Sequence, residues 1–259
     1  MNQYKRQEVS DESIALTQFE IRKAGDRGLG DYGWLKSWHT FSFDQYHDPD
    51  QIGFSDLIVL NDDYLRAGAG FDTHRHENME IFSYVLTGAL EHKDSMGTGS
   101  VMRPGDVQLM SAGTGVLHSE FNPSTTEPVH FLQIWIAPNR TGLEPGYRKA
   151  YFNAAEKRGK LRLIISSDGK SGSLKLHQDA KVLVGLLDGD EQFLYEIDRG
   201  RYIYVHIVRG ELTLNDEVLK EGDGVRVRGG TSLKFSRGKE AEVLIFDLVG
   251  KELPTSDVF

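Results

Sequence analysis

Two stretches of the sequence decide the fold: residues 80–90 read EIFSYVLTGAL, and residues 202–212 read YIYVHIVRGEL. In each, β-branched and aromatic residues precede a glycine, and a Gly-Asp pair follows later, at residues 105–106 and 222–223. An apolar strand, a turn glycine, a second strand and a Gly-Asp pair are typical of a β-hairpin with a returning strand. Because this pattern occurs twice, the sequence predicts two similar β units in tandem.

Further β-type runs, rich in Val, Ile, Leu, Phe and Tyr, fill much of the remaining chain. They lie at residues 54–60, 107–110, 131–136 and 242–248. Most of the 28 glycines and 7 prolines fall between such runs, which favours a sandwich or barrel over βαβ units. Helical signals are few and short, and residues 146–157 predict one or two helical turns. We therefore expect an all-β protein made of two tandem β-barrels with few short helices.

The predicted boundary between the two barrels lies near residue 145. Glycine and proline concentrate in residues 137–147, which is typical of a linker. The N-terminal barrel then covers residues 21–145 and the C-terminal barrel covers residues 146–259. Residues 1–20 form a polar N-terminal extension, and its beginning lacks the apolar segment of a secretory signal.

The composition excludes several kinds of chemistry. The chain has no cysteine, which rules out disulfide scaffolds, thiolate nucleophiles, cysteine zinc fingers and ordinary iron–sulfur clusters. The net charge is −9 and no cluster of five or more Lys/Arg occurs, so nucleic acid is not an expected partner. No apolar run approaches 18 residues, so no membrane association is expected. We predict a monomer in the cytoplasm.

Two short motifs carry the expected chemistry, His74-Arg75-His76 and His118-Ser119-Glu120. Residues at positions i and i+2 of a β-strand point to the same face, so each motif presents two donor side chains together. Two such pairs on neighbouring strands would bring three imidazoles and one carboxylate to one point. That ligand set suits a divalent transition metal, whereas calcium and magnesium prefer more oxygen ligands.

Longer motifs around these pairs carry a resemblance to known families. Gly68, His74, His76 and Glu80 resemble the first cupin motif, and residues 113–118 with Asn122 resemble the second. More narrowly, the two histidine motifs resemble the pirin family together with two further runs, Ser37-Trp38-His39-Thr40-Phe41-Ser42-Phe43 and Met110-Ser111-Ala112-Gly113-Thr114-Gly115. The resemblance is dense over residues 21–147 and looser towards the C-terminus. It implies a bicupin, in which both barrels are of the cupin type.

The pirin resemblance also implies a ligand set and an activity. Pirins are similar in using the carboxylate two residues after the second-motif histidine, so Glu120 is expected to complete the set with His74, His76 and His118. General cupins use the first-motif carboxylate, here Glu80, which remains the alternative. The expected ion is iron(II), with nickel, copper, manganese, zinc or cobalt as alternatives.

The activity implied is that of bacterial pirins described as quercetin 2,3-dioxygenases, which open the heterocycle of flavonols with O₂. The expected substrates are therefore a flavonol and O₂, and Glu120 would act as the catalytic base that accepts the proton of the flavonol hydroxyl. The alternative is a regulatory protein, similar to a transcription cofactor, that binds a protein partner according to the oxidation state of its metal.

The remaining features receive simpler interpretations. In the second repeat, Glu196, Asp198 and Phe235 stand where the first has its three histidines, so the C-terminal barrel is expected to hold no metal. His39 is expected to be packed and hydrogen-bonded, and His92 to bond Asp94 locally. Four aromatic residues are candidate walls of a substrate pocket: Phe54, Tyr84, Phe121 and Trp135.

Overall fold

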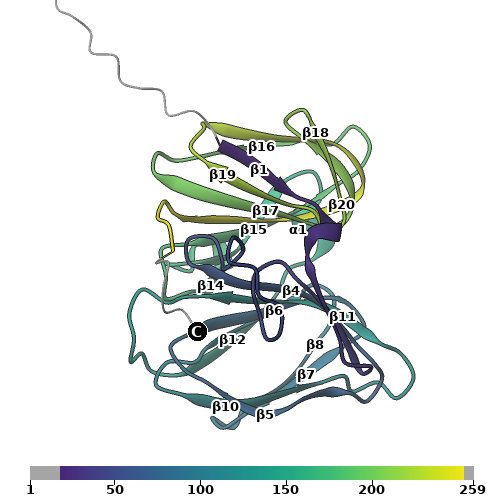
Figure 1. The fold of residues 1–259 in the computed structure, drawn as a ribbon, viewed down its shortest axis with the longest axis vertical. Coiled ribbons are helices and arrows are strands. Elements are labelled where there is room, and N and C mark those ends of the chain that lie inside the picture. Colours follow the sequence, from purple (N-terminus) through teal and green to yellow (C-terminus); the bar gives the residue numbers. More distant parts are fainter. Residues whose placement is uncertain (1–17, 254–259) are drawn as a thin grey trace, which may run out of the picture.

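The computed structural model describes residues 18–253, and these residues form an all-β protein, as predicted. The strands form three sheets that are almost wholly antiparallel (Figure 1). Three helical turns interrupt them: η1 (Ala24–Asp26), α1 (Ala154–Lys157) and η2 (Lys170–Gly172). Within the same residues, no helix is long and apolar enough to cross a membrane. Most of the predicted N-terminal extension, residues 1–17, lies outside the described residues.

Two sheets build the first lobe, which Figure 1 draws at the bottom. The larger sheet contains, in spatial order, β12 (Gly146–Tyr151), β9 (Asp106–Ser111), β6 (Glu80–Thr87), β11 (Val129–Ile136), β4 (Leu57–Leu65), β3 (Leu35–His39) and β2 (Gly28–Asp31). The smaller sheet contains β5 (Gly70–His76), β10 (Val116–Phe121), β7 (Leu90–Asp94) and β8 (Gly99–Met102). The smaller sheet lies at the outer end of the molecule, and the larger one lies between it and the second lobe.

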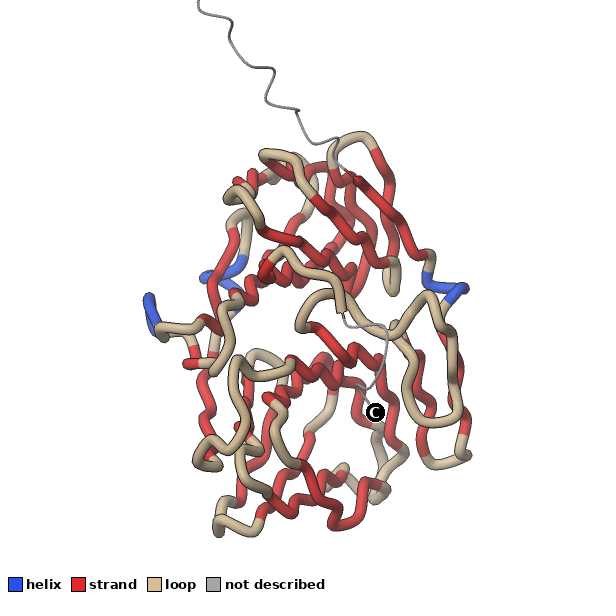
Figure 2. Tube along the Cα trace, turned by 60° about the vertical axis from the view of Figure 1, so that its left-hand side comes forward, coloured by secondary structure: helices blue, strands red, loops and turns tan. Residues whose placement is uncertain are grey.

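A single nine-stranded sheet builds the second lobe. Its main path contains β1 (Gln18–Arg22), β19 (Gly224–Arg228), β17 (Arg201–Leu214), β20 (Ser232–Val249), β15 (Lys181–Leu187), β13 (Leu161–Ser166) and β14 (Leu174–Lys175). Two short strands extend it, β16 (Phe193–Glu196) beside β20 and β18 (Glu217–Lys220) beside β17. The tube in Figure 2 shows that strands dominate both lobes and that the helical turns lie at the periphery.

Side chains alternate along β11, so the two faces of the large sheet line two different interiors. Leu132, Ile134 and Ile136 join an apolar core that also contains Val182 and Phe246 of the second lobe. The intervening residues point to the other face of the sheet, towards the interior of the first lobe. One face of the sheet therefore holds the lobes together, and the other is free to line a site.

The two Gly-Asp pairs form the same turn in both lobes. Asp106 accepts a hydrogen bond from the backbone N–H of Arg103 (2.9 Å), and Asp223 accepts one from the N–H of Lys220 (3.1 Å). In both turns the glycine before the aspartate has a positive φ, and a strand begins there, at Asp106 in β9 and one residue after Asp223 in β19. This shared turn supports the predicted internal repeat. The first turn glycine, Gly88, differs from the prediction, because it lies where the chain passes from one sheet to the other instead of within a hairpin.

The predicted helix at residues 146–157 is only partly correct. Residues 146–151 form β12, because they pair with β9 along its whole length. The helical part is the single turn α1, whose N-terminus has a capping box formed by Asn153 and Glu156. The predicted domain limits, 21–145 and 146–259, stay a prediction. β12 begins at residue 146 and lies in a sheet of the first lobe, whereas β1 begins at residue 18 and pairs with β19 in the second lobe.

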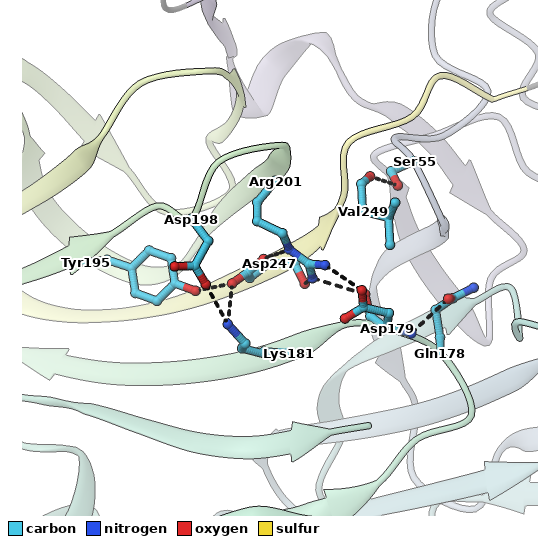
Figure 3. Close-up of polar contacts among 9 residues, drawn as sticks. All are labelled: Ser55, Gln178, Asp179, Lys181, Tyr195, Asp198, Arg201, Asp247 and Val249. Carbon is cyan, nitrogen blue, oxygen red and sulfur yellow. Dashed lines mark hydrogen bonds and ion pairs between the residues drawn. The ribbon is translucent and has the colours of Figure 1, made fainter. Parts of the chain in front are cut away.

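Polar contacts join the two lobes along their seam. Ser55 donates a hydrogen bond to the carbonyl of Val249 (2.6 Å), and Gln178 donates one to the carbonyl of Ala137 (2.9 Å). Beside them, Arg201, Lys181 and Tyr195 converge on the buried carboxylate of Asp247 (Figure 3). The two hydrogen bonds of Ser55 and Gln178 and the shared apolar core join the lobes, and the Asp247 network lies within the second lobe beside them.

Candidate metal centre

Three histidines of the first lobe converge where β5 and β10 pair. The register places His118 opposite His74 and Val116 opposite His76. The nitrogen ligand atoms of the three histidines lie within 4.8 Å of one another, and the Nε2 atoms of His74 and His118 are 3.0 Å apart. The cross-strand register and the i, i+2 spacing therefore bring the predicted histidines together.

The protonation state of these rings suits a cation. Burial, reinforced by the neighbouring imidazoles, lowers the pKa of His76 and of His118 to about 3. Both rings are therefore neutral at pH 7 and offer nitrogen lone pairs. The Nδ1 of His74 lies 2.7 Å from the carbonyl of Asp72, so it donates its proton there and leaves Nε2 free. Three imidazoles that converge in this way fit a divalent transition metal.

Glu120 lies beside this cluster but is held by other side chains. It belongs to a second group of candidate ligand atoms, with His118 and His92, which also lie within 4.8 Å of one another. Its carboxylate accepts hydrogen bonds from Ser83 (3.1 Å), Gln108 (2.9 Å) and Gln133 (2.5 Å). The pairing of β10 with β5 shifts between His118 and Glu120 because β5 has an extra residue there, but the pairing of β10 with β7 is regular, so His118 and Glu120 lie on the same face of β10.

Glu80, the alternative carboxylate, lies elsewhere. Its side chain accepts hydrogen bonds from Ser111 (3.0 Å) and from His177 of the second lobe (3.2 Å). Burial raises the pKa of Glu80, although these two neighbours oppose that shift. Glu80 therefore belongs to the seam between the lobes, and neither group of candidate ligands within residues 18–253 includes it.

A cavity of about 730 Å³ opens onto the histidine cluster. His74, His76 and Glu120 line it on one side, and its other walls come mostly from residues 32–71. Its aromatic walls are Tyr32, Trp34, Phe43, Tyr46, Phe71 and Trp135. The ring of Trp135 packs edge-on against both His76, with centroids 4.8 Å apart, and Phe43, with centroids 5.5 Å apart. The cavity can therefore hold a flat, apolar molecule next to the imidazoles.

Of the four predicted wall residues, only Trp135 lines this cavity. Phe54 and Tyr84 are buried in the core between the lobes, so that prediction is wrong for both. Phe121 lines a neighbouring hollow instead. Sequence reasoning missed Tyr32, Trp34, Phe43 and Tyr46 because they lie in the connections before and after β3, which give no strand periodicity from which to read a direction.

The other interpreted residues lie mostly where they were expected. His39 is buried and pairs with Asn61 (3.0 Å), and His92 pairs with Asp94 (3.0 Å), as predicted. Phe235, the counterpart of His118 in the second repeat, packs in the core of the second lobe. No sequence pattern indicated that His92 would face His118, because that contact depends on the register between β7 and β10.

Comparisons with known proteins agree with this architecture. Residues 20–136 match the family model described as Pirin, and residues 163–248 match the model described as Quercetinase C-terminal cupin domain. Two cupin domains in tandem, with a histidine cluster in the first, define the class of bicupin proteins. Within that class, the chain belongs to the pirin family.

Individual relatives support the family assignment over most of the chain. A protein of Escherichia coli K12 named quercetin 2,3-dioxygenase is 45% identical, over 88% of this chain and 97% of its own length. A protein of Pseudomonas aeruginosa named "Putative quercetin 2,3-dioxygenase" is 38% identical, over 88% of this chain and 98% of its own length. The crystal structure of the bacterial pirin YhhW from E. coli in complex with nickel(II) has a TM-score of 0.86 at 42% identity, covering 90% of this chain and all of that one.

Proposed function

We propose that the chain is a metal-dependent dioxygenase that opens the heterocycle of flavonols such as quercetin with O₂. The observation that carries this proposal is the convergence of three imidazoles at the wall of an aromatic cavity. The names of the E. coli and P. aeruginosa relatives support the substrate class. The nickel(II) complex of the E. coli pirin supports the presence of a divalent metal.

The proposed ligands are His74, His76, His118 and Glu120, with iron(II) as the native ion. When bound, such an ion supplies a Lewis-acidic and redox-active centre with open positions. For Glu120 to reach it, the carboxylate has to turn away from part of its present hydrogen-bond set. Ser83 and Gln108 bond Oε1 and Gln133 bonds Oε2, so the oxygen that does not turn keeps its own partners.

The side chains of the cavity have three roles in the proposed reaction. The aromatic walls stack on the flat rings of the flavonol and exclude water from them. Glu120 accepts the proton of the flavonol hydroxyl at a carboxylate oxygen, because it is the carboxylate nearest to the histidine cluster in the cavity wall. Ser83, Gln108 and Gln133 orient that carboxylate through their hydrogen bonds.

The function is tested by measuring metal content and quercetin-dependent O₂ uptake on the same preparations. We expect His118→Ala to lose both its metal and its quercetin-dependent O₂ uptake. The loss should exceed the 10- to 100-fold effect that is typical when a residue outside the direct ligand set is changed. Glu120→Gln should reduce both as well. Glu80→Gln is the matched control: it removes a charge at the seam and should leave metal content and O₂ uptake close to those of the unmodified protein.

Two results would contradict the proposal. One is full quercetin-dependent O₂ uptake by metal-free His118→Ala. The other is a fully metal-loaded protein that consumes no O₂ with any flavonol. Recovery of a stoichiometric protein partner in only one oxidation state of the metal would then support the regulatory alternative. The monomeric state and the cytoplasmic location stay predictions.

A further inference from the structure

A line of polar side chains continues behind His118, on the side away from His74. The Nδ1 of His118 lies 3.5 Å from the Nδ1 of His92. The Nε2 of His92 lies 3.0 Å from a carboxylate oxygen of Asp94. The other oxygen of Asp94 accepts hydrogen bonds from the backbone N–H groups of Met96 (2.9 Å) and Thr98 (3.0 Å). These two bonds fix the carboxylate in the turn between β7 and β8.

Hydrogen-bond chemistry assigns a direction to this line. An ionised carboxylate only accepts, so the Nε2 of His92 carries a proton and donates it to Asp94. With its proton on Nε2, His92 presents Nδ1 to His118 as an acceptor. The Nδ1 of His118 therefore donates to His92, and its Nε2 keeps a lone pair that points towards His74 and the cluster.

The surroundings of His92 hold this arrangement in place. The side chains of His92 and Asp94 are completely buried. The ring of Tyr147 stacks on His92, with centroids 4.9 Å apart, and the Tyr147 hydroxyl donates to Gln108 (3.0 Å), which in turn holds Glu120. The second group of candidate ligands, His92, His118 and Glu120, is therefore occupied by hydrogen bonds among its members and neighbours.

We propose that His92 and Asp94 are positioning residues of the metal centre, which fix the ring orientation and tautomer of His118 and strengthen its Nε2 as a ligand. The inference rests on the metal site of the proposed function. Partners of this kind, behind a ligating histidine, raise the basicity of the ligand, and their loss typically costs 10- to 100-fold in metal affinity. His92 and Asp94 are not among the proposed ligands, so their contribution can be measured separately from that of the ligands.

The experiment compares three variants of the full chain in their binding of nickel(II), measured by competition with a chelator. His92→Phe keeps a ring against Tyr147 but has no nitrogen, and we expect it to bind nickel(II) 10- to 100-fold more weakly. His92→Gln offers both a donor and an acceptor and should recover most of the lost affinity. The absorption spectrum of the cobalt(II)-loaded protein should shift in His92→Phe and return towards its original position in His92→Gln.

His130→Phe is the matched control. His130 is a second buried histidine that pairs with an aspartate, Asp62 (2.6 Å), and stacks on a tyrosine, Tyr64, with ring centroids 3.8 Å apart. It belongs to neither group of candidate ligands within residues 18–253. Its loss should lower stability and leave nickel(II) affinity and the cobalt(II) spectrum unchanged.

The outcomes separate this inference from the proposed function. If the unmodified protein binds nickel(II), His118→Ala does not, and His92→Phe binds as tightly as the unmodified protein, the positioning role is wrong and the metal site stands. Equal weakening in His92→Phe and His130→Phe would also overturn it, because the effect would then reflect general stability. If the unmodified protein binds no metal, both the metal site and the proposed function fail.

Discussion

Asp62 and Asp63 are neighbours in β4, and their carboxyl groups have opposite environments. Asp62 bonds His130 (2.6 Å) and Arg27 (3.1 Å), and these contacts lower its pKa although burial opposes them. Asp63 lines the cavity, and one of its oxygens is buried without a partner. Burial raises the pKa of Asp63 to about 8, although Ser37 opposes that shift.

This contrast predicts how stability depends on pH. A carboxyl group with a raised native pKa keeps its proton when folded and loses it when unfolded, so its contribution to stability falls as the pH rises from about 4 to about 8. Asp63→Asn cannot ionise. Its advantage in unfolding free energy over the unmodified protein should grow by about 1.4 kcal/mol per pH unit between pH 5 and pH 7. Urea denaturation at several pH values measures it.

Asp62→Asn is the control for Asp63→Asn, since it makes the same change on the opposite face of the strand. The lowered pKa of Asp62 means that its stabilising effect is complete above about pH 4 and is lost only as the pH falls further. Asp62→Asn should therefore be less stable than the unmodified protein at both pH 5 and pH 7, in contrast to Asp63→Asn. A difference between Asp63→Asn and the unmodified protein that does not change with pH would show that Asp63 is ionised in the folded protein.

At the scale of the strands, apolar runs and their alternation with polar residues were enough to predict the all-β class, several of the strands and the convergence of the histidines. The runs at 80–86, 131–136 and 242–248 all lie within strands. Residues 146–151 were misread because the pairing of β12 with β9 joins segments far apart in the sequence. The same reason hid the contact between His92 and His118. Local patterns give the direction of a side chain, and only the register gives its neighbours.

Gly88 illustrates a position where the backbone between two elements depends on glycine. It has a φ of +76°, and a Cβ there would lie 2.7 Å from the carbonyl oxygen of Pro128. Gly142 has a similar φ of +70°, but a Cβ added there would meet no atom within 4 Å. Gly142→Ala should cost about 1–2 kcal/mol of unfolding free energy, from the left-handed backbone alone. Gly88→Ala should cost about 1–3 kcal/mol more, from the added clash.

Urea denaturation of both alanine variants, at one pH, measures the two costs. Equal losses in Gly88→Ala and Gly142→Ala would mean that the chain near Pro128 moves aside freely. In that case the passage between the two sheets of the first lobe is less rigid than its close packing indicates.

At the scale of the whole molecule, the network around Asp247 connects the second lobe to the seam. Asp247 is buried and accepts hydrogen bonds from Arg201 (2.5 Å), Lys181 (3.2 Å) and Tyr195. Arg201 also bonds Asp179 (2.9 Å), which follows the residue that donates to Ala137 of the first lobe. The network therefore lies beside the contacts that join the lobes, although its own members all belong to the second lobe (Figure 3).

Removal of the central carboxylate should be costly. Asp247→Ala leaves the side chain of Arg201, which is only 12% exposed, without its main counter-charge. We expect a loss of about 3–5 kcal/mol in unfolding free energy, measured by thermal and urea denaturation. Asp198→Ala is the control, because Asp198 pairs with the same Lys181 but is 76% exposed, and its loss should change stability little. Similar losses in both variants would contradict this view of the network.

The position of β1 has a consequence for how the protein is made. Gln18 pairs with Arg228, so the first described strand of the chain finds its partner only after nearly all of the sequence has left the ribosome. Until then the edge of β19 is absent and the apolar residues Phe19 and Ile21, which pack against the second core, have no cover. Folding during synthesis can complete the sheets that face the cavity early, whereas the second lobe gains β1 only after β19 has been made.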